Sequence, residues 1–278
     1  MSQTPAPQNL PTIAFIGGGN MASAIIGGLI HQGHPASQIE VVEPWAEARE
    51  ALRKNYGIEA QAEAGPALQR AQIVVWAVKP QTFKDAAAQA KAHTQGALHL
   101  SVAAGIRSDS IAQWLGTERI VRTMPNTPAL VGKGMSALYA RPAVSAPERQ
   151  SIEAIMATTG EFLWVDSEPQ LDAVTALSGS GPAYVFYFLE AMTRAGTDMG
   201  LTAAQAHQLA VGTFVGASEL ARRSDETPAV LRQRVTSKGG TTYAALQSME
   251  HDAVAEKFMQ AMQAARQRAH ELGDEFGK

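Results

Sequence analysis

Ile13-Ala-Phe-Ile-Gly-Gly-Gly-Asn-Met-Ala22 is the stretch that decides the fold of the first half of this chain. An apolar run ends in three glycines and leads directly into the helical pattern of residues 23–30, which predicts a strand, a tight turn and a helix. The spacing Gly17-x-Gly19-x-x-Ala22 is typical of a dinucleotide-binding turn, whose pyrophosphate binds free N–H groups at the positive end of the helix. Glycines also serve ordinary turns, so the position between strand and helix is what favours a nucleotide.

The composition indicates a globular protein with room for two domains. The 278 residues are 45% hydrophobic and 18% charged, and the net charge of −3 gives no basic surface for a nucleic acid. Cysteine is absent, which excludes disulfides, thiolate metal sites and cysteine nucleophiles, and no metal site is expected. Residues 1–11 predict a flexible tail without the features of a signal peptide. No apolar run is long enough to span a bilayer, so we expect no membrane partner and a cytoplasmic location.

Strand-like and helical runs alternate from residue 12 to residue 166. The expected strands after the first cover residues 39–43, 73–78, 97–102, 119–123, 135–140 and 162–165. The expected helices between them cover residues 45–55, 80–93, 108–115 and 147–159. Residues 73–78 are continuously apolar, as in a strand buried on both faces of a parallel sheet. The pattern predicts an α/β fold, a Rossmann-type doubly wound sheet over residues 12–166.

Residues 167–278 lack strand-like runs and predict an all-helical domain. The expected helices cover residues 170–177, 182–199, 202–223, 228–235, 242–249 and 253–272. Several are apolar around much of their circumference, as in Tyr184-Val-Phe-Tyr-Phe-Leu189. A domain of about a hundred residues cannot bury so much apolar surface internally, so we expect a homodimer through this domain.

Two strand ends carry residues suited to a cofactor. Ala77-Val-Lys-Pro80 ends a central strand, where open α/β sheets bind ligands, and Lys79 either borders a phosphate or ribose or is a solvated strand-ending lysine. Ser101-Val-Ala-Ala-Gly105 contains only small residues. They suit either flat cofactor atoms lying against the backbone or tight packing under a helix.

Two further stretches leave a functional and a structural interpretation open. In Arg122-Thr-Met-Pro-Asn-Thr-Pro128, Asn126 and Thr127 offer hydrogen bonds from a rigid frame, although a plain rigid turn explains the stretch nearly as well. In the stretch 175–183, Ser178 and Ser180 precede a predicted helix and either cap it or line a ligand cleft.

Val235-Thr-Ser-Lys-Gly-Gly-Thr-Thr242 concentrates hydrogen-bond donors at the start of a predicted helix. The hydroxyls of Ser237, Thr241 and Thr242 join backbone N–H groups at the helix N-terminus. A cap needs one such hydroxyl, whereas three hydroxyls with a pair of glycines suit a small carboxylate.

Taken together, these motifs resemble, in order and spacing, those of the pyrroline-5-carboxylate reductases. The resemblance runs from about Thr12 to the last helix, and its most specific parts are Ser178-Gly-Ser-Gly-Pro-Ala-Tyr184 and Ser237-Lys-Gly-Gly-Thr-Thr242. It implies reduction of 1-pyrroline-5-carboxylate to L-proline by NADPH or NADH, the last step of proline biosynthesis. It also implies a Rossmann domain followed by a helical domain that dimerises, with dimers assembled further.

The resemblance also implies roles for particular residues. Thr242 and Ser237 would be catalytic, with the Thr242 hydroxyl directed at the ring nitrogen of the imine acid. The substrate would bind Ser237, Gly239, Gly240, Thr241, Thr242 and Asp225, although Asp225 would serve equally as a helix cap. The cofactor would bind Ile16, Gly17, Gly18, Gly19, Asn20, Met21, Glu43, Ala77, Val78, Lys79, Pro80, Val102, Ala103 and Ala104.

Two positions depart from the family pattern. Lys238 stands where many relatives have proline, which makes the loop less rigid and adds a positive charge. Glu43 stands where members that favour NADPH place a small hydroxyl or basic residue. A carboxylate there would accept hydrogen bonds from a ribose 2′-OH and repel a 2′-phosphate, which favours NADH, although Arg49 could still reach a phosphate.

Two alternatives have different sequence signatures. Another imine or keto-acid reductase of the same two-domain plan would place a catalytic Lys, Asp or His in the helical domain, whereas His207 lies in an apolar helix that favours a packed or interface histidine. A nucleotide-sensing protein without catalysis would not need Ser237, Thr241 and Thr242 together.

Overall fold

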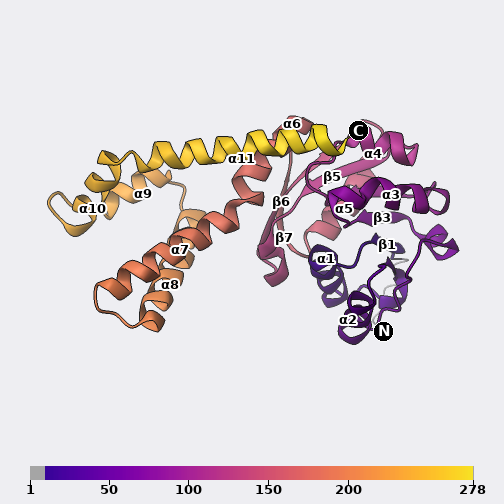
Figure 1. Cartoon of the computed structure of the whole chain (residues 1–278), viewed down its shortest axis with the longest axis horizontal. Coiled ribbons are helices and arrows are strands. Elements are labelled where there is room, and N and C mark those ends of the chain that lie inside the picture. Colours follow the sequence, from indigo (N-terminus) through magenta and orange to yellow (C-terminus); the bar gives the residue numbers. More distant parts are fainter. Residues whose placement is uncertain (1–9, 278) are drawn as a thin grey trace, which may run out of the picture. The chain divides into compact units, whose positions relative to one another are not determined.

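The computed structural model describes residues 10–277, so most of the tail expected over residues 1–11 lies outside the described residues. The chain forms two compact units (Figure 1). The first extends to Ser180 and takes in the end of the chain from Ala265, while the second comprises Gly181–Ala264. The boundary expected at residues 166/167 follows the last strand. The first unit continues beyond it because α6 (Glu168–Val174) packs against the sheet.

The first unit is built on a seven-stranded sheet with the order β2-β1-β3-β4-β5-β6-β7. The strands are β1 (Ile13–Ile16), β2 (Ile39–Val42), β3 (Ile73–Trp76), β4 (Leu98–Ser101), β5 (Ile120–Met124), β6 (Gly134–Ala140) and β7 (Gly160–Trp164). The first five run parallel, whereas β6 is antiparallel to β5 and β7 is parallel to β6. The predicted doubly wound sheet is confirmed, including its extension by the last two strands.

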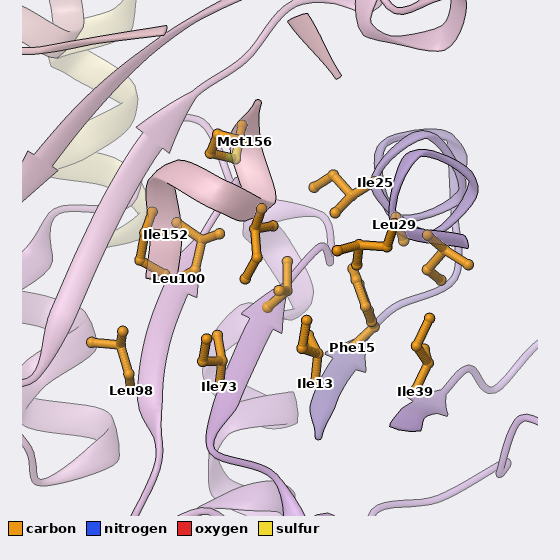
Figure 2. Close-up of a cluster of buried hydrophobic side chains, with 14 of the residues drawn as sticks. Ile13, Phe15, Ile25, Leu29, Ile39, Ile73, Leu98, Leu100, Ile152 and Met156 are labelled. Atoms are coloured by element: carbon orange, nitrogen blue, oxygen red, sulfur yellow. The ribbon is translucent and has the colours of Figure 1, made fainter. Parts of the chain in front are cut away.

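Helices cover both faces of this sheet. They are α1 (Asn20–His31), α2 (Ala46–Tyr56), α3 (Pro80–Ala90), α4 (Ser108–Leu115) and α5 (Ala146–Met156). Alternate residues of each strand point to opposite faces, so Ile13 and Phe15 join one core with α1, α2 and α5, while Ala14 and Ile16 join the other with α3 and α4. Figure 2 shows the first core, where Phe15 lies against Ile25 and Leu29 of α1.

The second unit consists of α7 (Gly181–Asp198), α8 (Ala203–Arg223), α9 (Pro228–Arg234), α10 (Thr241–His251) and the first part of α11 (Val254–Phe276), up to Ala264. Helices α7 and α8 approach closely, because a Cβ on Gly196 would lie 2.8 Å from the Cβ of Ala206. Phe258 of α11 packs edge-on against Tyr184 and Phe188 of α7, with ring centroids 5.4 and 5.8 Å apart. No helix among the described residues has the length and apolar character needed to cross a membrane.

Little of the second unit is buried within this chain. Only Gly196, Ala206 and Ala210 are buried in it, while many large apolar side chains stay exposed on its helices. The most exposed of these on α7 and α8 are Phe186, Tyr187, Leu209, Val215 and Leu220. Since apolar surface on this scale marks an interaction site, the unit is built to pack against another chain.

The segment between α6 and α7 is helical, whereas the sequence predicted a break in the helix there. Residues Thr175–Gly179 form a π-helix that joins α6 to α7, in which Ser180 N–H donates to the Thr175 carbonyl at 2.8 Å. The sequence predicted a gap after residue 177 and a new helix at 182. That prediction is wrong because the glycines and serines there continue the helix in a wider turn, so Ser178 and Ser180 do not cap a separate helix.

Candidate functional site

The carboxyl ends of β1, β3 and β4 lie side by side and bring together three of the stretches expected to bind cofactor. Ala77 N–H donates to the Ile16 carbonyl at 2.8 Å, and Val102 N–H donates to the Trp76 carbonyl at 3.1 Å. The chain goes from β1 to β2 on one side and then to β3 on the other, so this edge is the switch point where open α/β sheets bind ligands.

The turn between β1 and α1 has the geometry of an anion cradle. Gly17 adopts φ +98°, and a Cβ there would lie 2.6 Å from the carbonyl oxygen of Ala77, so only glycine fits. A Cβ on Gly19, by contrast, would meet no described atom within 4 Å. Gly19 is the N-cap of α1, so no side chain at that position covers the first N–H groups of the helix. The open space and the free donors together fit a pyrophosphate.

Glu43 lies directly beside this turn, at the end of β2. Its carboxylate is almost fully buried and accepts the Gly18 N–H at 2.7 Å and the Trp45 N–H at 2.9 Å. Each carboxylate oxygen keeps a second lone pair for a ribose hydroxyl. The Nη1 atom of Arg49 donates to the carbonyls of Glu43 at 2.9 Å and Pro44 at 2.6 Å, so this guanidinium holds the loop.

Trp45 belongs to none of the motifs predicted from the sequence, yet its side chain is exposed at the same edge of the sheet. The indole is 71% exposed and follows the strand-ending acid by two residues. The signal in the sequence was a large aromatic residue two positions after a polar strand end, where an ordinary turn has small or polar residues.

The remaining cofactor candidates fall at the ends of β3 and β4. Lys79 is exposed and is the N-cap of α3. The hydroxyl of Ser101 accepts the Ala103 N–H at 3.3 Å. Gly105 serves tight packing, because a Cβ there would lie 2.9 Å from the Cβ of Leu272 in α11.

Asn126 supports the framework of the first unit. Its Nδ2 donates to the Ser178 carbonyl at 3.1 Å, and its Oδ1 accepts the Met135 N–H at 2.9 Å. The amide therefore ties β5 to β6 and to the π-helix, which favours the rigid-frame interpretation of this stretch. The adjacent Thr127 begins a short 3-10 helix, Thr127–Val131.

The second glycine loop lies in the second unit, directly before α10. Gly240 N–H donates to the Ser237 carbonyl at 3.0 Å, and Gly239 adopts φ +76°, as in a type II turn with Lys238 at its second position. Gly240 is the N-cap of α10 and brings no side chain to cap it. Ser237, Thr241 and Thr242 are exposed, so their hydroxyls and the first N–H groups of α10 are accessible at one loop.

Asp225 precedes α9 in the same unit and is exposed. The N-cap of α9 is Thr227, whose hydroxyl accepts the Val230 N–H at 3.4 Å. The capping role considered for Asp225 therefore belongs to Thr227, and the carboxylate of Asp225 remains accessible to a ligand.

Two protein families match the chain separately, one in its strand-and-helix part and one in its all-helical part. Residues 12–105 match the family described as NADP oxidoreductase coenzyme F420-dependent, and residues 168–272 match pyrroline-5-carboxylate reductase dimerisation.

Individual proteins match over nearly the whole length. The pyrroline-5-carboxylate reductase of Pseudomonas aeruginosa is 45% identical over 270 residues, which cover 96% of this chain and 99% of that protein. A solved pyrroline-5-carboxylate reductase from Coxiella burnetii superimposes with a TM-score of 0.87 at 38% identity, over 95% of this chain and 99% of that one. The Plasmodium falciparum pyrroline carboxylate reductase, solved with NADP bound, gives a TM-score of 0.85 at 27% identity, over 95% and 98% of the two chains.

The chain has a dinucleotide turn, a second glycine loop and a region that matches a dimerisation domain. It is also 45% identical to a known relative over nearly the full length of both proteins. This chain belongs to the pyrroline-5-carboxylate reductase family.

Proposed function

We propose that this chain reduces 1-pyrroline-5-carboxylate to L-proline with NADH, in the cytoplasm. The observation that carries the proposal is the exposed loop Ser237–Thr242, whose three hydroxyls and uncapped helix start match a small carboxylate. The glycine turn at Gly17–Gly19 binds the pyrophosphate of the cofactor, which supplies the hydride.

The substrate carboxylate binds at the start of α10. The Ser237 and Thr241 hydroxyls donate to it, together with the first N–H groups of the helix. The N–H of Gly240 already donates within the loop, so we assign Gly240, like Gly239, the role of shaping the turn. Lys238 adds a positive charge at the same turn, which favours an anionic ligand.

Thr242 orients the ring nitrogen of the imine through its hydroxyl. When bound, the reduced nicotinamide supplies a hydride to the imine carbon. A threonine hydroxyl is far too weak an acid to protonate an amine unaided, so Thr242 holds and polarises the nitrogen, which is protonated beforehand or through water. Asp225, exposed and free of the capping role, contributes a negative charge near the protonated ring.

The preference for NADH rests on Glu43. A buried carboxylate fixed beside the glycine turn accepts hydrogen bonds from a ribose 2′-OH and repels a 2′-phosphate. The Plasmodium falciparum relative was solved with NADP, so the shared fold alone does not select the cofactor. Comparing kcat/KM for NADH and NADPH tests the proposal, and a strong preference for NADPH would contradict it.

The second unit forms a homodimer, and dimers assemble further. The exposed apolar side chains of α7 and α8 are the surface that pairs. Light scattering on the purified protein should give a mass of at least two chains.

Replacement of Thr242 tests the assignment of the substrate loop. Thr242→Ala should lower kcat by about a hundredfold, because the ring nitrogen is no longer oriented and polarised, while Thr242→Ser keeps the hydroxyl and most of the activity. The side chain is exposed, so circular dichroism and thermal unfolding of both variants should match the parent protein. Full activity of Thr242→Ala would contradict the assignment.

A direct assay of NADH oxidation that depends on 1-pyrroline-5-carboxylate separates this proposal from the two alternatives. Another imine or keto-acid reductase would oxidise NADH only with a different substrate. A nucleotide-sensing protein would bind NADH without oxidising it.

A further inference from the structure

Trp45 is an exposed aromatic residue at the carboxyl end of β2. Its side chain is 71% exposed, whereas the other three tryptophans, Trp76, Trp114 and Trp164, are buried or partly buried, and all four lie within the described residues. A flat aromatic side chain exposed at the edge of the sheet where open α/β folds bind ligands is placed to contact a bound ligand.

The backbone under this indole is held firmly from two sides. Trp45 N–H donates to Glu43 Oε1 at 2.9 Å, and Arg49 Nη1 donates to the Pro44 carbonyl at 2.6 Å. Trp45 is also the N-cap of α2, with an extended backbone at φ −83° and ψ 122°. The backbone of Trp45 is therefore held in place, and its exposed ring remains available to a ligand.

The neighbouring groups identify the ligand that would reach this ring. Gly17 N–H donates to the Val42 carbonyl at 2.8 Å and Gly18 N–H donates to Glu43, so the pyrophosphate turn and the end of β2 are in contact. With the pyrophosphate at Gly17–Gly19 and the ribose at Glu43, the base attached to that ribose extends past Glu43 along the loop that carries Trp45. An indole offers a flat π face to a purine.

We propose that Trp45 is the stacking surface for the adenine of the dinucleotide and sets the affinity of the enzyme for the adenylate half of its cofactor. The inference rests on the cofactor placement under the proposed function and adds to it a residue that recognises the base. Since stacking ignores the 2′ substituent, Trp45 should act equally on NADH and NADPH, whereas Glu43 separates them.

The test uses the full chain and three probes: ADP, 2′-phospho-ADP and reduced nicotinamide mononucleotide, which lacks the adenylate. Trp45→Leu keeps a bulky apolar side chain without a π face and should weaken ADP and 2′-phospho-ADP binding in calorimetry by about tenfold. Trp45→Phe keeps an aromatic face and should lose less than about threefold. ADP should quench the tryptophan fluorescence of the parent protein, and both variants should lose that quenching.

Turnover with reduced nicotinamide mononucleotide separates stacking from general damage. Trp45→Leu should leave it unchanged, because this probe has no adenine. Unchanged ADP affinity in Trp45→Leu would overturn the proposal, as would an equal loss of turnover with the mononucleotide.

The same titrations distinguish this inference from the NADH proposal. If the parent protein binds 2′-phospho-ADP more tightly than ADP, the NADH proposal fails, while a fall of both affinities in Trp45→Leu still supports stacking. If the parent protein binds neither probe, both fail.

Discussion

The carboxylate of Glu43 accepts the backbone N–H of Gly18 at 2.7 Å, which fixes the acid of β2 against the glycine turn of β1. Glu43→Gln keeps an oxygen acceptor for this N–H but removes the negative charge. We expect kcat/KM for NADPH to rise relative to NADH by about tenfold, which corresponds to ~1.4 kcal/mol of relieved repulsion. Steady-state kinetics with both cofactors measures the ratio.

A second variant shows whether charge is the cause. Glu43→Asp keeps the charge and should retain the preference for NADH, even if the shorter side chain weakens the bond to Gly18. Equal ratios for the Gln variant and the parent protein would show that this carboxylate does not face the ribose.

His99 makes the folded protein sensitive to acid. It is buried on β4, where its Nδ1 accepts the Trp76 Nε1–H at 3.0 Å. Burial lowers the pKa of His99 to about 4, with a further lowering by Arg119 and an opposing hydrogen bond to the Thr94 backbone. The unfolded chain, with a pKa near 6.5, takes up the proton first as the pH falls. The stability that His99 contributes is thus complete above about pH 6.5 and is lost progressively down to about pH 4.

The loss assigned to His99 is about 3 kcal/mol over this range. Urea unfolding at pH 7, 6, 5 and 4 measures it, with His99→Gln as the comparison because Gln still accepts the Trp76 N–H. The variant should be less stable at pH 7 and should lose less stability on acidification. Parallel pH profiles for the two proteins would contradict the assignment.

The sequence predicted most of the sheet because local and global signals agree there. Ile73–Trp76 is continuously apolar and fully buried, as expected of a central parallel strand. Helix α4 has the predicted bounds of Ser108 and Leu115, with Gly116 in the left-handed conformation at its C-cap. In these elements the hydrophobic pattern and the residues at the ends predict the same structure, and tertiary packing favours that structure too.

The remaining features depend on contacts between distant residues, which a local pattern does not contain. The π-helix at Thr175–Gly179 ends in the Ser-Gly pair of a loop, but Met124 at the end of β5 packs against it and Asn126, just after that strand, donates to its backbone. The hydrogen bond between Glu43 and Gly18 joins the ends of two strands that are distant in the sequence. The sequence therefore predicted that both residues bind the cofactor, but it did not predict the hydrogen bond between them. Thr227 rather than Asp225 caps α9, and this shift of two residues leaves the Asp225 carboxylate accessible.

The ion pair between Arg122 and Glu168 stabilises the end of β5 against α6. Their Nη1 and Oε1 atoms are 2.6 Å apart, and the side chains are 8% and 18% exposed. Glu168 also accepts the N–H of Ser108 at 2.6 Å and its hydroxyl at 3.0 Å. Glu168→Ala should lower the free energy of unfolding by about 3 kcal/mol, because it leaves a buried guanidinium unpaired.

Glu50→Ala serves as the control for Glu168, since it removes an exposed pair with Arg53 and should leave the unfolding midpoint unchanged. Urea titration at one protein concentration compares the two variants. A loss for Glu168→Ala no larger than that of the control would show that Arg122 is satisfied by water.

Ala253 is strained in the turn between α10 and α11. It has φ +52°, and no other described residue apart from glycines has a positive φ. A Cβ in this conformation costs roughly 1–2 kcal/mol, which glycine avoids, although glycine gains freedom in the unfolded chain. Ala253→Gly should therefore raise the free energy of unfolding by about 0.5–1 kcal/mol.

Ala261→Gly provides the matched control for Ala253, because Ala261 is an exposed residue in the interior of α11. There the same substitution should lower the free energy of unfolding by about 1 kcal/mol. Both are measured by urea unfolding at one protein concentration, since dimerisation makes the midpoint depend on concentration. Opposite signs for the two substitutions would follow from strain at Ala253, and equal losses would contradict it.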